Sequence, residues 1–97
     1  MHASYLKNII LNAMNKQELI EKLKIIVKPY TTNSEAYQNL NENTDFIKDL
    51  KINSANLVDI VLDVEEQFDV IIENEDMERM LDIKTAVEII ETKLAAK

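Results

Sequence analysis

The chain has 97 residues, no glycine and a single proline, Pro29. Tight β-hairpin turns, glycine-rich phosphate loops and dinucleotide-binding fingerprints all depend on glycine, so none of them is expected. Asparagine, aspartate and serine are plentiful and can form the turns between helices. The sequence therefore predicts an all-α fold.

Charge and length narrow the function classes. The formal net charge is −7, which disfavours nucleic acid and anionic membrane surfaces as partners and favours proteins with basic patches. No apolar run approaches the roughly 20 residues of a membrane span, and the first residues lack the features of a signal peptide. The chain is long enough for one small domain but not for a deep catalytic cavity. We expect a cytoplasmic monomer.

Cysteine is absent. The chain therefore has no disulfide framework, no thiol nucleophile and no thiolate metal site.

The first clear helix begins at Asn15, which forms a capping-box pattern with Glu18. An apolar stripe at helical spacing follows, made by Leu19, Leu23 and Ile26. Pro29 is expected to end this helix and to push Lys28 out of helical geometry. Residues 30–51 then read as a long loop anchored by apolar side chains, namely Tyr37, Leu40, Phe46, Ile47 and Leu50.

Three further helices are predicted. One runs from about Ser54 to Asp69, with Asn53 as its expected N-cap. Its buried stripe consists of Leu57, Ile60, Val61, Val64 and Phe68. A short one within residues 73–81 depends on Met77, Met80 and Leu81. The last is capped by Asp82 and buries Ile83, Ala86, Val87, Ile90 and Leu94.

Residues 1–14 form an N-terminal extension to a domain at 15–97. Their apolar stripe, Leu6, Ile9, Ile10 and Ala13, fits either a separate helix or a backward extension of the first one. Alternatively, Met14 is the native initiator and the preceding residues are an added segment.

Catalytic and metal-binding chemistry is poorly supported. The single histidine, His2, lies at the terminus, so Ser54 has no base to activate its hydroxyl. Acids between Asp59 and Asp76 lack the alternating ligand pattern and the central glycine of a calcium-binding EF-hand loop. We assign no catalytic residue and no metal site and expect a protein that is not an enzyme. Clustered carboxylates could still bind divalent cations without a dedicated site.

One face of the predicted helix at residues 54–69 is acidic. Asp59, Asp63 and Glu66 lie opposite the apolar stripe, and no basic residue occurs between Lys51 and Arg79. The simplest interpretation is a solvated surface. Like charges at i, i+4 lower helix stability, however, so the uncompensated acids favour an electrostatic docking surface.

The segment TDFIKDLKINSANLVDIVLDVEEQFDV resembles the region around the attachment serine of acyl carrier proteins, the phosphopantetheine-binding carriers. The shared features are Asp45-Phe46, Asp49-Leu50, Ser54, the apolar helix after it, and the run Glu65-Glu66-Gln67-Phe68-Asp69. The resemblance covers roughly residues 15–95. It implies a small four-helix bundle with a long loop between the first two helices and a short third helix.

The same resemblance implies a covalent 4′-phosphopantetheine arm on Ser54, which carries acyl groups as thioesters. A separate phosphopantetheinyl transferase would attach the arm from coenzyme A with Mg²⁺, which explains why Ser54 needs no base of its own. Asp59, Asp63 and Glu66 would contact basic patches on acyl-loading, condensing and acyl-transfer enzymes, with Leu62 beside them. Fatty-acid, lipid or polyketide-type biosynthesis would be the setting.

Three positions depart from the family pattern: Asn53 replaces the usual Asp, Ala55 the usual Leu, and Lys51 the usual Gly. They suggest a specialised bacterial-type discrete carrier, with Asn53 and Ala55 affecting which transferase accepts it. Two alternatives stay open: an unmodified helical interaction module with a carrier-like fold, and a peptidyl or aminoacyl carrier.

Overall fold

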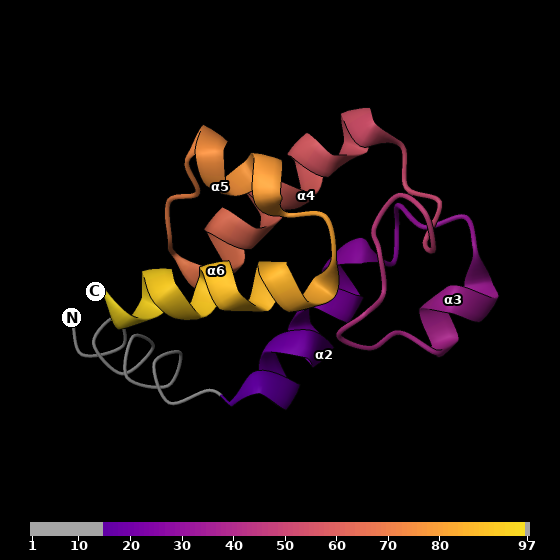
Figure 1. Ribbon diagram of the computed structural model, residues 1–97, viewed down its shortest axis with the longest axis horizontal. Coiled ribbons are helices and arrows are strands. Elements are labelled where there is room, and N and C mark those ends of the chain that lie inside the picture. The colour runs from indigo at the N-terminus through magenta and orange to yellow at the C-terminus, as the bar shows by residue number, and fades with distance from the viewer. Residues whose placement is uncertain (1–14, 97) are drawn as a thin grey trace.

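The computed structural model describes residues 15–96, and the predicted all-α fold is confirmed (Figure 1). Within this range lie α2 (Lys16–Val27), α3 (Ser34–Gln38), α4 (Ser54–Phe68), α5 (Asn74–Arg79) and α6 (Ile83–Ala95). The long helix α2 packs against both α4 and α6. The four predicted helices correspond to α2, α4, α5 and α6, and the short third one is α5. The predicted extension at residues 1–14, which includes His2, lies outside the described residues.

The predicted loop at residues 30–51 contains one helix that periodicity did not indicate, α3. Its cap is Asn33, whose side-chain oxygen accepts a hydrogen bond from the Ala36 backbone N–H at 3.2 Å. Five residues are too few to show an apolar stripe, so the signal is only the capping residue. In Figure 1, α3 lies at one end of the molecule, away from α5.

Side-chain caps set the starts of the long helices as predicted. Asn15 and Glu18 form a complete capping box, with hydrogen bonds of 2.9 and 3.0 Å. Asp82 caps α6 by accepting from the Thr85 N–H at 2.8 Å. Helix α2 ends at Val27 ahead of Pro29, but the expectation for Lys28 was wrong. Its φ and ψ of −50° and −47° are still helical, since the preference of a pre-proline residue is steric and surmountable.

The core is one apolar cluster shared by α2, α4, α6 and the segments between them. Phe46 and Leu50, predicted loop anchors, are fully buried, and Tyr37 and Leu40 pack partly against the cluster. The predicted stripes of α2, α4 and α6 face it, although Ile26 and Leu57 are only partly buried. Burial of this kind contributes roughly 25 cal/mol per Å² of apolar surface.

Two predicted apolar anchors were wrong. Ile47 is 40% exposed, because in the turn at residues 46–49 the Phe46 side chain is buried in the core and the Ile47 side chain is not. Leu81 is 54% exposed and lies beyond α5, where Met80 takes the buried position. The Leu81 backbone is still used, since its carbonyl accepts from the Phe46 N–H at 3.0 Å.

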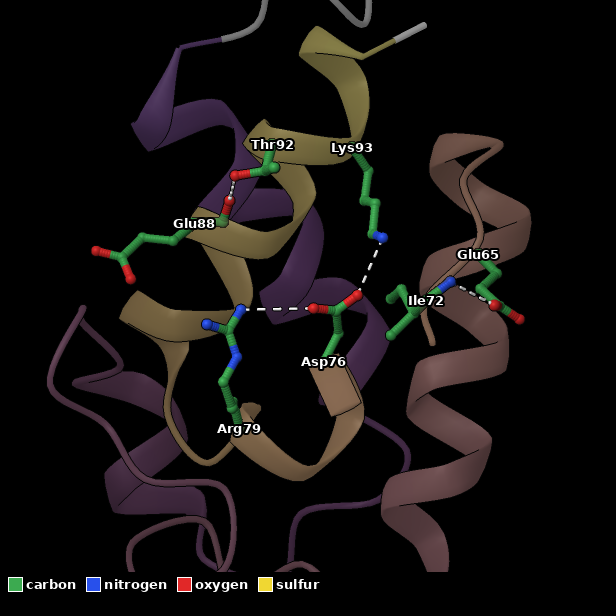
Figure 2. Close-up of polar contacts among 7 residues, drawn as sticks. All are labelled: Glu65, Ile72, Asp76, Arg79, Glu88, Thr92 and Lys93. Carbon is green, nitrogen blue, oxygen red and sulfur yellow. Dashed lines mark hydrogen bonds and ion pairs between the residues drawn. The ribbon is translucent and has the colours of Figure 1, made fainter. Parts of the chain in front are cut away.

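Met77 of α5 packs, partly buried, against the core, and polar contacts also hold this helix in place (Figure 2). Asp76 forms ion pairs with Lys93 of α6 at 3.0 Å and with Arg79 of its own helix at 3.5 Å. Glu65 of α4 accepts from the Ile72 backbone N–H at 2.7 Å, just before α5. The short helix is therefore connected by side-chain polar groups to the helices on both sides.

The Asp76–Lys93 contact predicts a pH-dependent loss of stability in Lys93→Met. The hydrogen bond from Lys93 is the main cause that lowers the pKa of Asp76, assisted by the charges of Lys93 and Arg79 against the opposing effect of burial. An acid with a lowered folded-state pKa adds stability above its unfolded pKa of about 3.9 and loses it as pH falls through the folded value.

We therefore expect Lys93→Met to reduce the free energy of unfolding by about 0.5–1 kcal/mol at neutral pH. The deficit relative to wild type should shrink below about pH 4. Urea unfolding at several pH values measures it, with Lys84→Met, an exposed lysine of the same helix, as the control. An equal deficit at all pH values would exclude this explanation.

Candidate functional site

Ser54 is the first residue of α4, and its side chain is exposed. Asn53 precedes it in extended geometry and accepts a hydrogen bond from the Ala55 N–H at 2.8 Å through its side-chain oxygen. The predicted cap is therefore present, and the capping is done by Asn53. Ala55 is exposed beside Ser54. This leaves the Ser54 hydroxyl at the positive end of a fifteen-residue helix whose first turn contains no acid.

The chain segment that leads to Ser54 contains a compact turn at residues 45–49, which holds it in place. The Asp45 side chain accepts from the Ile47 and Lys48 N–H groups at 2.9 and 2.8 Å. Asp49 accepts from the Asp45 N–H at 2.7 Å. The acids of this segment thus close the turn, while the buried side chains of Phe46, Leu50 and Ile52 anchor it.

A second segment, residues 31–33, holds the same stretch from the other side, and sequence reasoning did not identify it. Thr31 donates its hydroxyl hydrogen to the Leu50 carbonyl at 2.7 Å, and Thr32 to the Lys51 carbonyl at 3.2 Å. Asn33 donates to the Asp49 carbonyl at 2.9 Å. Three successive side-chain donors after Pro29-Tyr30 are the only sequence signal for this role.

The predicted acidic face of α4 consists of Asp59, Asp63 and Glu66, and all three side chains are exposed. Leu62 and Val58 lie exposed on the same helix, at 56% and 47%. Among residues 15–96, the ion pairs join Lys16 to Glu42 and Asp76 to Arg79 and Lys93, so none neutralises the acidic face. The face is available to a basic surface of another protein.

Glu65 behaves differently from these acids. It is half-buried and its carboxylate accepts from the Ile72 N–H, so its role is structural.

Histidine and metal-binding clusters are absent from the described part of the chain. Residues 15–96 contain no histidine, and no three acidic side chains within them are arranged to hold a metal ion. No helix of this range is long and apolar enough to cross a membrane.

Comparison with known proteins places the chain in a family. It is 31% identical over 84 residues to the acyl carrier protein of Coprothermobacter proteolyticus, a match covering 87% of this chain and all of that protein. It is 35% identical over 81 residues to the acyl carrier protein of Petrotoga mobilis, covering 84% and 93%. The chain belongs to the acyl carrier protein family. No family model matches it.

Solved acyl carrier proteins share the architecture. The crystal structure from Thermotoga maritima superposes with a TM-score of 0.68 at 26% identity, over 87% of this chain and 95% of that one. The Enterococcus faecalis protein gives a TM-score of 0.66 at 23% identity, over 82% and 99%. The small all-α fold of the acyl carrier family is therefore confirmed for residues 15–96.

One departure from the family pattern has a direct backbone consequence. Lys51, at the position of the usual glycine, has a φ of 57°, which is the left-handed region. That conformation costs a residue with a Cβ roughly 1–2 kcal/mol, while glycine reaches it without the steric penalty. The loop before Ser54 therefore has the left-handed backbone conformation that suits a glycine, although the residue there is Lys51.

Lys51→Gly should raise the free energy of unfolding by about 0.5–1 kcal/mol, once the greater freedom of glycine in the unfolded chain is subtracted. Urea denaturation measures the change. Lys48→Gly is the matched control, because Lys48 is an exposed loop lysine with negative φ. It should lower the free energy of unfolding. If both variants shift it alike, strain at Lys51 is not the cause.

Proposed function

We propose that Ser54 carries a covalent 4′-phosphopantetheine arm and that the chain transports acyl groups on it. The observation that carries this proposal is an exposed serine hydroxyl at the start of α4 in a member of the acyl carrier family. Because Asn53 does the capping, the Ser54 hydroxyl needs no role in the helix. A helix N-terminus without acids favours an anionic phosphodiester by about 0.3–1 kcal/mol.

When attached, the arm supplies a terminal thiol that holds acyl groups as thioesters. Ser54 contributes the oxygen to which the arm is joined, and Asn53 keeps the helix start in place around it. The described residues near Ser54 offer no histidine base. We assign uptake of the Ser54 hydroxyl proton to the phosphopantetheinyl transferase. The Ser54 oxygen would bond to the phosphorus next to the pantetheine of coenzyme A as its pyrophosphate bond breaks, which releases adenosine 3′,5′-bisphosphate. The chain is then a substrate and carrier rather than an enzyme.

The partners of this function are enzymes with basic docking patches. We assign the acidic face of α4 to electrostatic contact with them and Leu62 to an apolar contact beside it. We assign Asn53 and Ala55, which flank Ser54, to contact with the transferase. We assign the carrier function to residues 15–97, in the cytoplasm where coenzyme A is supplied, and in fatty-acid, lipid or polyketide-type synthesis.

Intact-mass analysis tests the proposal. The purified chain is incubated with coenzyme A, Mg²⁺ and a broad-specificity transferase, and in parallel with the transferases of its own organism. We expect a single mass increase equal to one phosphopantetheinyl group. No increase with any transferase would refute the assignment.

A second candidate is an unmodified interaction module with a carrier fold. The exposed Ala55 favours it, because alanine stands in place of the usual leucine and offers a partner less apolar surface next to Ser54. The chain isolated from its native host would then show no added mass. A peptidyl or aminoacyl carrier would instead be loaded by the corresponding amino-acid-activating enzymes.

A further inference from the structure

Tyr30 links the end of α2 to the acidic face of α4. Its backbone N–H donates to the Val27 carbonyl at 2.9 Å, which fixes the residue just beyond the helix. Its ring packs partly against the core. Its hydroxyl donates to a carboxylate oxygen of Asp63 at 3.1 Å, across 33 positions of sequence. Tyr30 is thus the side chain that holds the Asp63 carboxylate in one orientation.

Tyr30 is a neutral hydrogen-bond donor to Asp63. Burial raises the pKa of the Tyr30 phenol, and so do the hydrogen bond to Asp63 and the charges of Asp63 and Asp59. The phenol therefore stays protonated and donates at neutral pH. It differs from the partners of Asp76, which are cations that offset the carboxylate charge. Tyr30 therefore occupies one acceptor site of the Asp63 carboxylate without adding a positive charge, and the remaining acceptor sites can take further hydrogen bonds.

We propose that Tyr30 is a positioning residue of the docking surface and that it makes Asp63 selective for an arginine of the partner over a lysine. The inference rests on the proposed docking role of the acidic face. A guanidinium presents planar, forked donors that match a carboxylate whose plane is already fixed. An ammonium is a point charge that gains little from a fixed orientation. Holding Asp63 in advance removes part of the ordering cost for arginine alone.

The occupant is therefore a basic surface that places a guanidinium on Asp63, near Asp59. Charge complementarity supports this choice, because the acidic face contains no ion pair among the described residues.

The test uses Tyr30→Phe, which removes the hydroxyl and keeps the ring. Two matched helical peptides, with their basic positions all arginine or all lysine, are titrated at low salt into isotope-labelled full-length chain and followed by NMR. We expect Tyr30→Phe to weaken arginine-peptide binding by about threefold to fivefold and lysine-peptide binding by less than about 1.5-fold. In an Asp63→Asn background, Tyr30→Phe should have no further effect. Tyr37→Phe is the control, because Tyr37 lies on α3 and its ring is covered by Lys24 Nζ, 5.2 Å from the ring centroid.

Equal losses for both peptides, no loss for either, or an undiminished effect in Asp63→Asn would each overturn the inference. Thermal unfolding of the variants shows whether stability has changed. The proposed arm is tested separately, because peptide titration needs no modification of Ser54. A failure of arm attachment alone would therefore leave this inference standing.

Discussion

Ser54→Ala is expected to abolish attachment of the phosphopantetheine arm while leaving the fold intact. The substitution removes the only oxygen at that position that can be joined to the arm. The free energy of unfolding should stay within about 0.5 kcal/mol of wild type, as is usual for exposed positions. Asn53 caps α4 without help from Ser54, and alanine has the higher helix propensity.

Ser34 provides the matched control. It too is exposed and is the first residue of a helix whose cap is an asparagine, here Asn33. Ser34→Ala should therefore gain the same mass as wild type after incubation with coenzyme A and transferase. Intact-mass analysis and circular dichroism measure the two outcomes. A mass increase in Ser54→Ala, or its loss in Ser34→Ala, would place the attachment site elsewhere.

The helices could be predicted because local chemistry and burial agree along them. Asn15, Asn53 and Asp82 were each expected to be caps, and each accepts the hydrogen bond that a cap requires. The apolar stripes then matched the side of each long helix that packs into the core. Pro29 ended α2 as expected.

The connections were harder because their side chains are not periodic. In the segment between α4 and α5, which is not helical, Val70 and Ile72 are buried and Ile71 between them is 74% exposed. Such alternation belongs to an extended chain, and three successive apolar residues do not reveal which of them points inward. The prediction that Ile47 is a buried anchor was wrong for a similar reason, since a turn orients each side chain individually.

The site was predictable where it depends on neighbours in sequence. Asn53 and Ser54 were placed correctly at the start of α4. Asp59, Asp63 and Glu66 were placed correctly on its exposed face. The supports from Thr31, Thr32 and Tyr30 were not predictable, because each joins residues that are distant in sequence. Lys51 shows a further limit. A non-glycine residue at positive φ reads as an ordinary loop lysine until the backbone is known.

Reversing two charges on the acidic face, with Asp59→Lys and Asp63→Lys together, should have the second large effect. We expect kcat/KM for arm attachment to fall by about tenfold to a hundredfold at low ionic strength, because a basic partner surface is then repelled rather than attracted. Both positions are exposed and mid-helix, where lysine is at least as helix-favouring as aspartate. Asp63→Lys also removes the acceptor of the exposed Tyr30 hydroxyl, so the thermal unfolding midpoint should fall by no more than a few degrees.

Glu88→Lys with Glu91→Lys is the matched control, since it changes the net charge equally on exposed positions of α6. If only the overall charge of the chain mattered, both double variants would slow attachment to the same degree. If the acidic face is the docking surface, the α6 variant stays near the wild-type rate. Added salt should slow attachment to the wild type, because it screens an attraction. It should not slow attachment to the α4 variant, where it screens a repulsion. If the α4 variant had the wild-type rate at low salt, the acidic face would not be part of the docking surface.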